Sequence, residues 1–280
     1  AGELRDLKGL GKKTEENILK GIRDYRDWQD RFLLSDTDSI VETLTDYLKE
    51  SKKVDRFEVA GSWRRRKETV GDLDVLAISE ENTQLMNYFT DWEKIQSVES
   101  AGETKSTVLL KSNFRVDLRI LPERQFGSAL GYFTGSKAHN IHLRSLAREK
   151  GYTISEYGVF KIAEGETDTE QSTSKKPNDE RWVAGKKEED LYDALHLPWI
   201  TPELREDRGE IEAASKNNLP DLIQQKDIKG DLQVHSDWSD GNNTMEEMIE
   251  KAIELGYAYI AITDHSKAMA MTGGLDEEKA

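Results

Sequence analysis

Two kinds of hydrophobic spacing follow one another along the 280 residues. Between Leu4 and Leu48, apolar residues recur at helical spacing among charged ones, and a glycine turn at Gly9 and Gly11 predicts a break between two helices. From residue 57 the pattern becomes that of strands, expected over 57–60, 73–78, 106–110 and 115–121, with a polar helix near 82–89. Strands and helices in this order predict an α+β fold.

The second half of the chain changes pattern twice. Residues 127–150 predict helix, and residues 163–179, rich in Glu, Thr, Ser and Lys, predict a loop or a mobile hairpin. Prolines at 198, 202 and 220 indicate a linker. After it we expect a strand over 231–235, an amphipathic helix over 245–255 and a buried strand over 259–263, which is the start of a second, βαβ-type domain.

Composition narrows the chemistry. The chain has no Cys, which excludes disulfides, thiolate metal sites and cysteine nucleophiles. No apolar run approaches the ~20 residues of a membrane span, and no signal peptide is visible, so we expect a cytoplasmic protein without membrane contact. The net charge of -15 argues against a protein that coats DNA. Basic residues nevertheless gather at 64–67 and 137–150, which leaves a local basic groove open.

Three aspartates stand out as candidate metal ligands. Asp72 and Asp74 lie two positions apart on an expected strand, so their carboxylates project from the same face. Asp117 alternates with apolar residues on another expected strand. If the strands are neighbours, the three carboxylates converge, as two Mg²⁺ ions in phosphoryl transfer require. The alternative is that they are solvent-facing acids on amphipathic strands.

A basic turn precedes the paired aspartates. Gly61-Ser62-Trp63-Arg64-Arg65 joins a small, flexible turn to guanidinium groups, a combination suited to a triphosphate. Taken alone, the motif favours an exposed turn. Its position just before the acidic strand favours the phosphate-binding interpretation.

These motifs resemble those of the family X nucleotidyltransferases of the DNA polymerase beta type. The matching segments are 61–65, 71–74 and 115–117, followed by Gly131-Tyr132-Phe133-Thr134-Gly135-Ser136 with Asn140 and Arg144 behind it. The resemblance implies a palm sheet with helical fingers and thumb. The implied domains are fingers with a helix-hairpin-helix-like element at 1–56, palm at 57–122, thumb at 123–200, a linker at 201–229 and a partial PHP domain at 230–280.

The resemblance also implies roles for individual residues. Asp72, Asp74 and Asp117 would be the catalytic residues and would bind two Mg²⁺ ions, with Mn²⁺ as an alternative. Nucleotide binding would fall to Gly61, Ser62, Arg65, Gly71, Tyr132, Phe133, Gly135, Asn140 and, more weakly, Arg31. Arg144, Gly9 and Gly11 would contact DNA. Without the resemblance, Tyr132 and Phe133 are equally good core aromatics, and Asn140 and Arg144 are equally a solvated helix face.

The implied activity is template-directed addition of a dNTP to gapped or primer-template DNA by a monomer. Two alternatives stay open: nucleotidyl transfer to an acceptor other than DNA, and a DNA-binding module without catalysis. The family's amino-terminal lyase domain is not expected in this sequence, so removal of deoxyribose phosphate is not expected either.

The last fifty residues resemble the opening of a PHP (polymerase and histidinol phosphatase) domain. The matching residues imply four metal-ligand candidates, which are His235, Asp240, Asp264 and His265. Gln233 stands where the family's first histidine is usual, and an amide oxygen is a poorer ligand than imidazole for Zn²⁺ or Mn²⁺. The later ligand motifs are not found before residue 280. We therefore expect weak metal binding or none at this site, and no 3′-5′ exonuclease activity.

Overall fold

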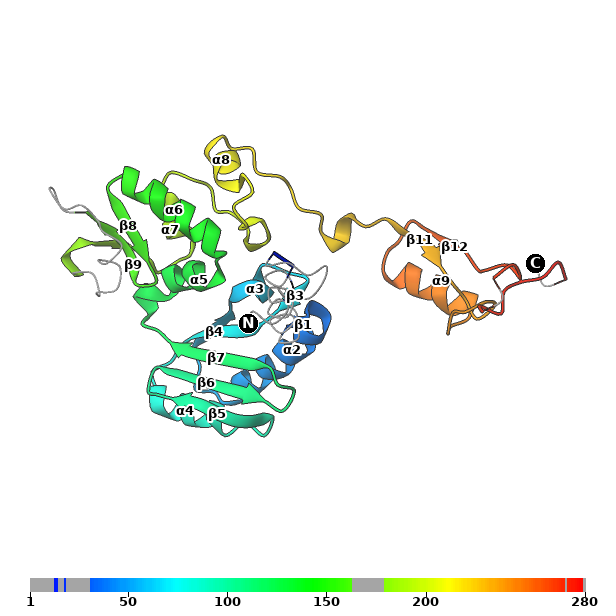
Figure 1. Cartoon of the computed structure of the whole chain (residues 1–280), viewed down its shortest axis with the longest axis horizontal. Helices are drawn as coiled ribbons and strands as arrows, with labels where there is room; N and C mark the ends of the chain where they lie inside the picture. Colours follow the sequence, from blue (N-terminus) through cyan, green and yellow to red (C-terminus); the bar gives the residue numbers. More distant parts are fainter. Residues whose placement is uncertain (1–12, 15–17, 19–30, 163–178, 270, 279–280) are drawn as a thin grey trace. The chain divides into compact units, whose positions relative to one another are not determined.

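The computed structural model describes residues 13–14, 18, 31–162, 179–269 and 271–278. The chain divides into two compact units, Ala1–Leu219 and Pro220–Ala280 (Figure 1). The turn at Gly9 and Gly11 lies outside the described residues, as does nearly all of the loop expected at 163–179.

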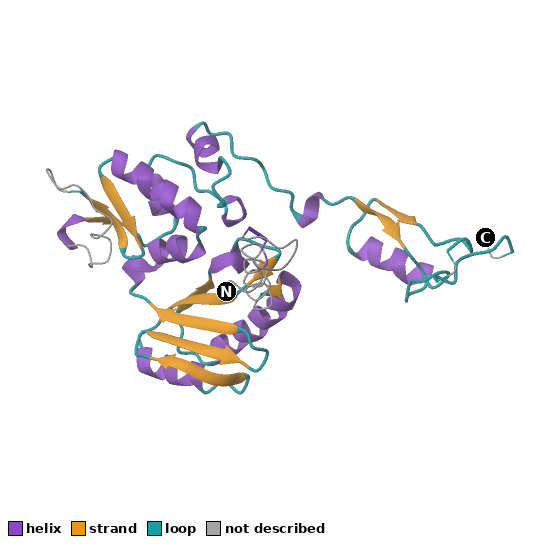
Figure 2. Ribbon diagram, in the orientation of Figure 1, coloured by secondary structure: helices purple, strands orange, loops and turns teal. Residues whose placement is uncertain are grey.

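A five-stranded sheet forms the first layer of the larger unit (Figure 2). Its strands, in spatial order, are β2 (Arg56–Val59), β4 (Asp72–Ile78), β7 (Arg115–Ile120), β6 (Lys105–Leu110) and β5 (Ile95–Ala101). β4 and β7 run parallel, and the other neighbours are antiparallel. Four of the strands confirm the prediction. The edge strand β5 was not predicted, since six of its seven residues are exposed and its sequence is mostly polar.

The two faces of this sheet are covered differently. On one face, Leu73, Val75 and Val116 pack against the helices α2 (Leu34–Glu50) and α4 (Asn82–Thr90). On the other face, Leu76 packs against Phe126 of the helix α5 (Phe126–Thr134). Because side chains alternate along a strand, the residues flanking Leu73 project on the α5 side. A short helix, α3 (Gly61–Arg64), and the paired strands β1 (Phe32–Leu33) and β3 (Thr69–Val70) lie beside this edge of the sheet.

The second layer of the larger unit is a helical body with a small sheet. It contains α5, α6 (Lys137–Glu149), the antiparallel strands β8 (Tyr152–Ser155), β9 (Gly158–Lys161) and β10 (Trp182–Ala184), and the helices α7 (Glu189–Asp193) and α8 (Glu210–Ser215). The continuous helix expected over 127–150 is two helices, because Gly135 has a φ of 72°, a value that ends the first helix. The side chain of Ser136 then caps α6 by accepting a hydrogen bond from the amide of His139.

The linker expected over 201–229 is wrong in its first part. Ile211 and Ala214 of α8 are buried in the same apolar cluster as Leu143 and Leu191, so α8 belongs to the helical body. Contacts within the first unit continue to Leu219. The acidic, proline-marked composition of this stretch concealed a short amphipathic helix. Single 3₁₀ turns occupy Glu123–Gln125, Asp179–Arg181, Pro202–Leu204 and Gln225–Asp227.

The smaller unit has the βαβ order that the sequence predicts. Strands β11 (Gly230–Val234) and β12 (Tyr259–Ile262) pair in parallel, and α9 (Met245–Glu254) connects them. Thr244 and Glu247 form a reciprocal capping box at the start of α9. The expectation that β12 is buried is wrong, since Tyr259 is 52% exposed and the rest of the strand is half-buried. None of the described helices is long and apolar enough to span a membrane.

Candidate active site

The three aspartates meet on one face of the sheet. β4 and β7 are adjacent and parallel, with Asp74 opposite Asp117 and Asp72 opposite Arg115. Asp72 is exposed, whereas Asp74 and Asp117 are half-buried. The predicted convergence is therefore present. It arises because Leu73, Val75 and Val116 occupy the opposite, buried face.

The carboxylates crowd one another and attract cations. Burial raises the pKa of Asp74 to about 6, and the charge of Asp72 adds to the rise. Lys105 lies 2.9 Å and Arg119 lies 3.3 Å from Oδ2 of Asp117. Neither cation was singled out in the sequence. The clustered carboxylates fit hard cations such as Mg²⁺, which bind oxygen ligands and relieve this repulsion.

The basic turn lies against these acids. Gly61 has a φ of 69°, and a Cβ placed on it would be 3.7 Å from Oδ2 of Asp74. The guanidinium of Arg31 lies beside Gly71, 3.2 Å from the position of a Cβ there. Arg31 is held by hydrogen bonds to the hydroxyl and the carbonyl of Thr69. The structure thus brings Gly61, Gly71 and Arg31 to the edge of the acidic cluster.

One arginine of the turn is part of a buried network. Arg64 donates two hydrogen bonds, of 2.6 and 2.8 Å, to the two carboxylate oxygens of Glu188. Arg205, which is fully buried, donates to the same carboxylate at 2.6 Å, and the indole of Trp199 donates at 3.0 Å. Burial alone would raise the pKa of Glu188, but the hydrogen bonds from Arg64 and Arg205 outweigh it and lower the pKa to about 2.

Arg65, the expected phosphate ligand, also has partners in the helical body. Its Nε lies 2.8 Å from Oε1 of Glu206, and its Nη1 donates to the carbonyl oxygen of Thr134. Lys67 lies 3.8 Å from the same Glu206 oxygen. The basic cluster at 64–67 is therefore paired with acids rather than open as a groove. The acidic stretches at 188–193 and 203–212 are the sequence signal for these partners.

The expected nucleotide segment spans the junction of α5 and α6. Tyr132 is 37% exposed, and Phe133 is half-buried with Arg119 stacked 4.5 Å above its ring. The side-chain amide of Asn140 donates to the carbonyl of Tyr132 at 2.7 Å. Asn140 and Arg144 line one small pocket together with Tyr132. A Cβ placed on Gly135 would lie 3.1 Å from Nη1 of Arg65. This segment therefore lies next to the basic turn.

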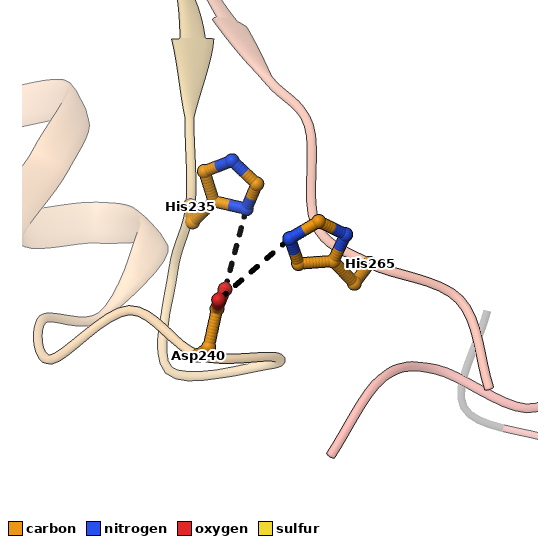
Figure 3. A group of neighbouring side chains, drawn as sticks. All are labelled: His235, Asp240 and His265. Atoms are coloured by element: carbon orange, nitrogen blue, oxygen red, sulfur yellow. Dashed lines mark ion pairs between the residues drawn. The ribbon is translucent and has the colours of Figure 1, made fainter. Parts of the chain in front are cut away.

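The smaller unit holds a second cluster of candidate ligands. Asp240 lies between His235 and His265, at 3.3 and 3.6 Å from their ring nitrogens (Figure 3). The three side chains offer ligand atoms within 4.8 Å of one another, and Nδ1 of His235 is buried without a well-aligned hydrogen-bond partner in the described part of the chain. Two imidazoles and a carboxylate fit a transition-metal cation such as Zn²⁺ or Mn²⁺.

Asp264 is placed apart from this cluster. Its carboxylate accepts hydrogen bonds from the amide and hydroxyl of Ser236, at 2.8 and 2.6 Å, and from the hydroxyl of Ser239 at 2.5 Å. These bonds join the loop after β12 to the loop after β11. Of the four candidates, Asp264 thus serves the fold, while the other three face one another.

Comparison with known proteins finds similar sequences for both units. Residues 129–206 match the DNA polymerase beta thumb, and residues 231–277 match the PHP domain. The chain is 37% identical over 279 residues, 99% of its length, to the DNA polymerase/3′-5′ exonuclease PolX of Bacillus subtilis. Over nearly its whole length, this chain is therefore similar to a family X DNA polymerase. It is also 24% identical over 221 residues, 72% of its length, to DNA polymerase lambda of Rattus norvegicus.

The chain spans only part of these relatives, 46% of the Bacillus subtilis protein and 38% of the rat protein. Its fold resembles that of Leishmania infantum polymerase beta in a ternary gap complex, with a TM-score of 0.54 and 21% identity over 65% of this chain and 73% of that one. The α+β class is therefore confirmed. The five-stranded sheet corresponds to the expected palm, and the helical body to the thumb.

Proposed function

We propose that this chain is a template-directed DNA polymerase that adds a deoxynucleotide to a primer 3′-hydroxyl, acting at short gaps. One observation carries the proposal. Asp74 and Asp117 are register partners on neighbouring parallel strands, and a Cβ placed on Gly61 of the basic turn would lie 3.7 Å from Oδ2 of Asp74. Carboxylates facing a candidate triphosphate site are the arrangement that phosphoryl transfer requires.

In this proposal each candidate residue has a separate role in binding the metals, the nucleotide or the DNA. Asp72, Asp74 and Asp117 would hold two Mg²⁺ ions, or Mn²⁺, which when bound hold the attacking and leaving oxygens of an in-line displacement. Asp117 helps to take the proton of the primer hydroxyl. Ser62, Arg65 and Arg31 hold the triphosphate, from which pyrophosphate leaves. Tyr132 and Phe133 flank the sugar, Asn140 contacts the base and Arg144 contacts the template strand.

Primer extension with a purified Asp117→Ala variant tests the proposal. We expect the loss of at least two orders of magnitude in rate, because the variant lacks one of the carboxylates that meet at the reacting atoms. Asp91→Ala, which removes an exposed aspartate at the end of α4, is the matched control and should extend primers like the wild type. Unchanged extension by Asp117→Ala would refute the assignment.

The substrates are tested in the same assay. Faster extension on a gapped duplex than on an open primer-template would support gap filling. Preference for dNTP over NTP would support the proposal that Tyr132 and Phe133 flank the sugar. Binding of gapped DNA without any turnover in the presence of Mg²⁺ would instead support a non-catalytic module. We further propose that this chain has no 3′-5′ exonuclease activity, since Gln233 replaces an imidazole ligand.

A further inference from the structure

Glu206, a carboxylate of the thumb, forms an ion pair with Arg65, the arginine that would bind the triphosphate in the proposed function. Glu206 pairs with Nε of Arg65 at 2.8 Å and with Lys67 at 3.8 Å. The side chains of Arg65 and Glu206 are 14% and 21% exposed, so the pair is shielded from much of the solvent. One carboxylate therefore neutralises two cations that follow Ser62 in the basic turn.

The position of Glu206 is fixed by its neighbours in the chain. Arg205 is fully buried, and its side chain is held by Glu188 and by the carbonyl of Ile200 at 2.8 Å. The carbonyl of Arg205 accepts a hydrogen bond from the amide of Ser136 at 2.9 Å, and the amide of Glu206 donates to Leu204 at 2.8 Å. Glu206 is thus presented to Arg65 by an anchored backbone.

An incoming triphosphate and Glu206 require the same groups. Phosphate oxygens bind guanidinium most strongly when two N–H groups point at them. In the structure, Nε of Arg65 is directed at Glu206 and Nη1 at the carbonyl of Thr134. A triphosphate can bind Arg65 fully only if the Glu206 carboxylate leaves, and its greater negative charge is what can displace a single carboxylate.

We propose that Glu206 is an internal competitor of the triphosphate, a residue that acts through Arg65 to set the affinity of the nucleotide pocket. When pyrophosphate has formed, the same carboxylate returns to Arg65 and Lys67 and favours release of the product. The ligand class rests on the proposed function, whereas the competition rests on the ion pairs alone.

Binding of inorganic tripolyphosphate to the full chain, without DNA or divalent metal, tests the proposal by calorimetry. We expect Glu206→Gln to bind about fivefold more tightly than the wild type, the magnitude of a partly exposed ion pair. Glu203→Gln is the matched control, since it removes the same charge from an exposed side chain three residues away. In an Arg65→Ala background the Glu206→Gln gain should fall below twofold.

Steady-state primer extension supplies a second readout. Glu206→Gln should lower the KM for dNTP and strengthen inhibition by pyrophosphate, while kcat changes less than twofold. A merely structural role for Glu206 would raise KM and lower the thermal midpoint instead. The proposal is overturned if Glu206→Gln binds tripolyphosphate no more tightly than the wild type or Glu203→Gln, or if the gain persists without Arg65.

The two proposals fail separately. A wild-type chain that extends no primer, with a Glu206→Gln variant that binds tripolyphosphate more tightly, would refute the polymerase activity and keep the role of Glu206. A wild-type chain that extends primers, with a Glu206→Gln variant of unchanged affinity, would do the reverse.

Discussion

Burial and ion pairing have opposite effects on the pKa of the Glu188 carboxyl group. The residue is 6% exposed, yet it is ionised, because Arg64, Arg205 and Trp199 together donate four hydrogen bonds to it. Charged groups are tolerated at such depth only when they are paired. Since Arg64 belongs to the palm and Arg205 to the thumb, this single carboxylate connects the two layers.

Glu188→Gln should destabilise the protein by about 3–5 kcal/mol at pH 7, because two arginines then lose their buried counter-charge. Urea unfolding at neutral pH measures the loss, with the exposed neighbour Glu189→Gln as control. An equal unfolding midpoint for Glu188→Gln and the wild type would contradict the importance of the network.

The same residue predicts a dependence of stability on pH. The pKa of Glu188 falls from 4.5 to about 2 on folding, so its stabilisation is complete above pH 4.5 and is lost as the pH falls from 4.5 toward 2. A shift of this size corresponds to about 3 kcal/mol. The stability gap between wild type and Glu188→Gln should therefore shrink over this window, and a constant gap would exclude Glu188 as its source.

Among the elements, α5 and the start of α7 approach unusually closely. A Cβ on Gly127 would lie 2.0 Å from the carbonyl carbon of Lys187 and 2.5 Å from the amide nitrogen of Glu188. Only glycine allows this contact, and the contact sets the position of Glu188 against the palm. Gly131 lies one turn later and faces the flexible end of the Leu191 side chain. A Cβ placed on Gly131 would lie 2.4 Å from Cδ1 of Leu191.

Gly127→Ala should therefore destabilise the protein by about 1–3 kcal/mol, although alanine is intrinsically the better helix former by about 1 kcal/mol. Gly131→Ala should cost less, since a leucine methyl group moves more easily than backbone. Urea midpoints of both variants give the order. If Gly131→Ala lowered the urea midpoint more than Gly127→Ala, the backbone at Lys187 would have moved to accommodate the new methyl group, and the prediction would be wrong.

The strands differ in how far the sequence could predict them. β4 and β7 were predictable because alternation is a local property, and it places Asp72 and Asp74 on one face of their strand and Asp117 on the polar face of its own. That β4 and β7 are neighbours, which brings the three together, is a property of the fold. β5 was not, because an exposed edge strand needs few apolar residues. The pair between Arg65 and Glu206 joins positions 141 residues apart, and only the packing of thumb on palm brings them together.

At the scale of the whole molecule, the two units carry donor sets of different chemistry. The palm offers three carboxylates, and the smaller unit offers two imidazoles and one carboxylate. Hard Mg²⁺ favours the first set, whereas imidazole ligands favour transition metals such as Zn²⁺, and a set that includes a carboxylate also accepts Mn²⁺. Because the donor sets share no residue, substitutions in one should leave metal binding in the other unchanged.

Titration with Mn²⁺, followed by electron paramagnetic resonance, tests this independence in an Asp72→Asn, Asp74→Asn background that weakens the palm site. We expect a remaining weak site that His265→Ala removes. Gln233→His should tighten it at least tenfold, because the new imidazole lies two residues before His235, where an extended chain directs both side chains to one side. Gln225→His adds a histidine outside the cluster and should change nothing. Binding that survives His265→Ala, or that ignores Gln233→His, would mean that the ion is held elsewhere.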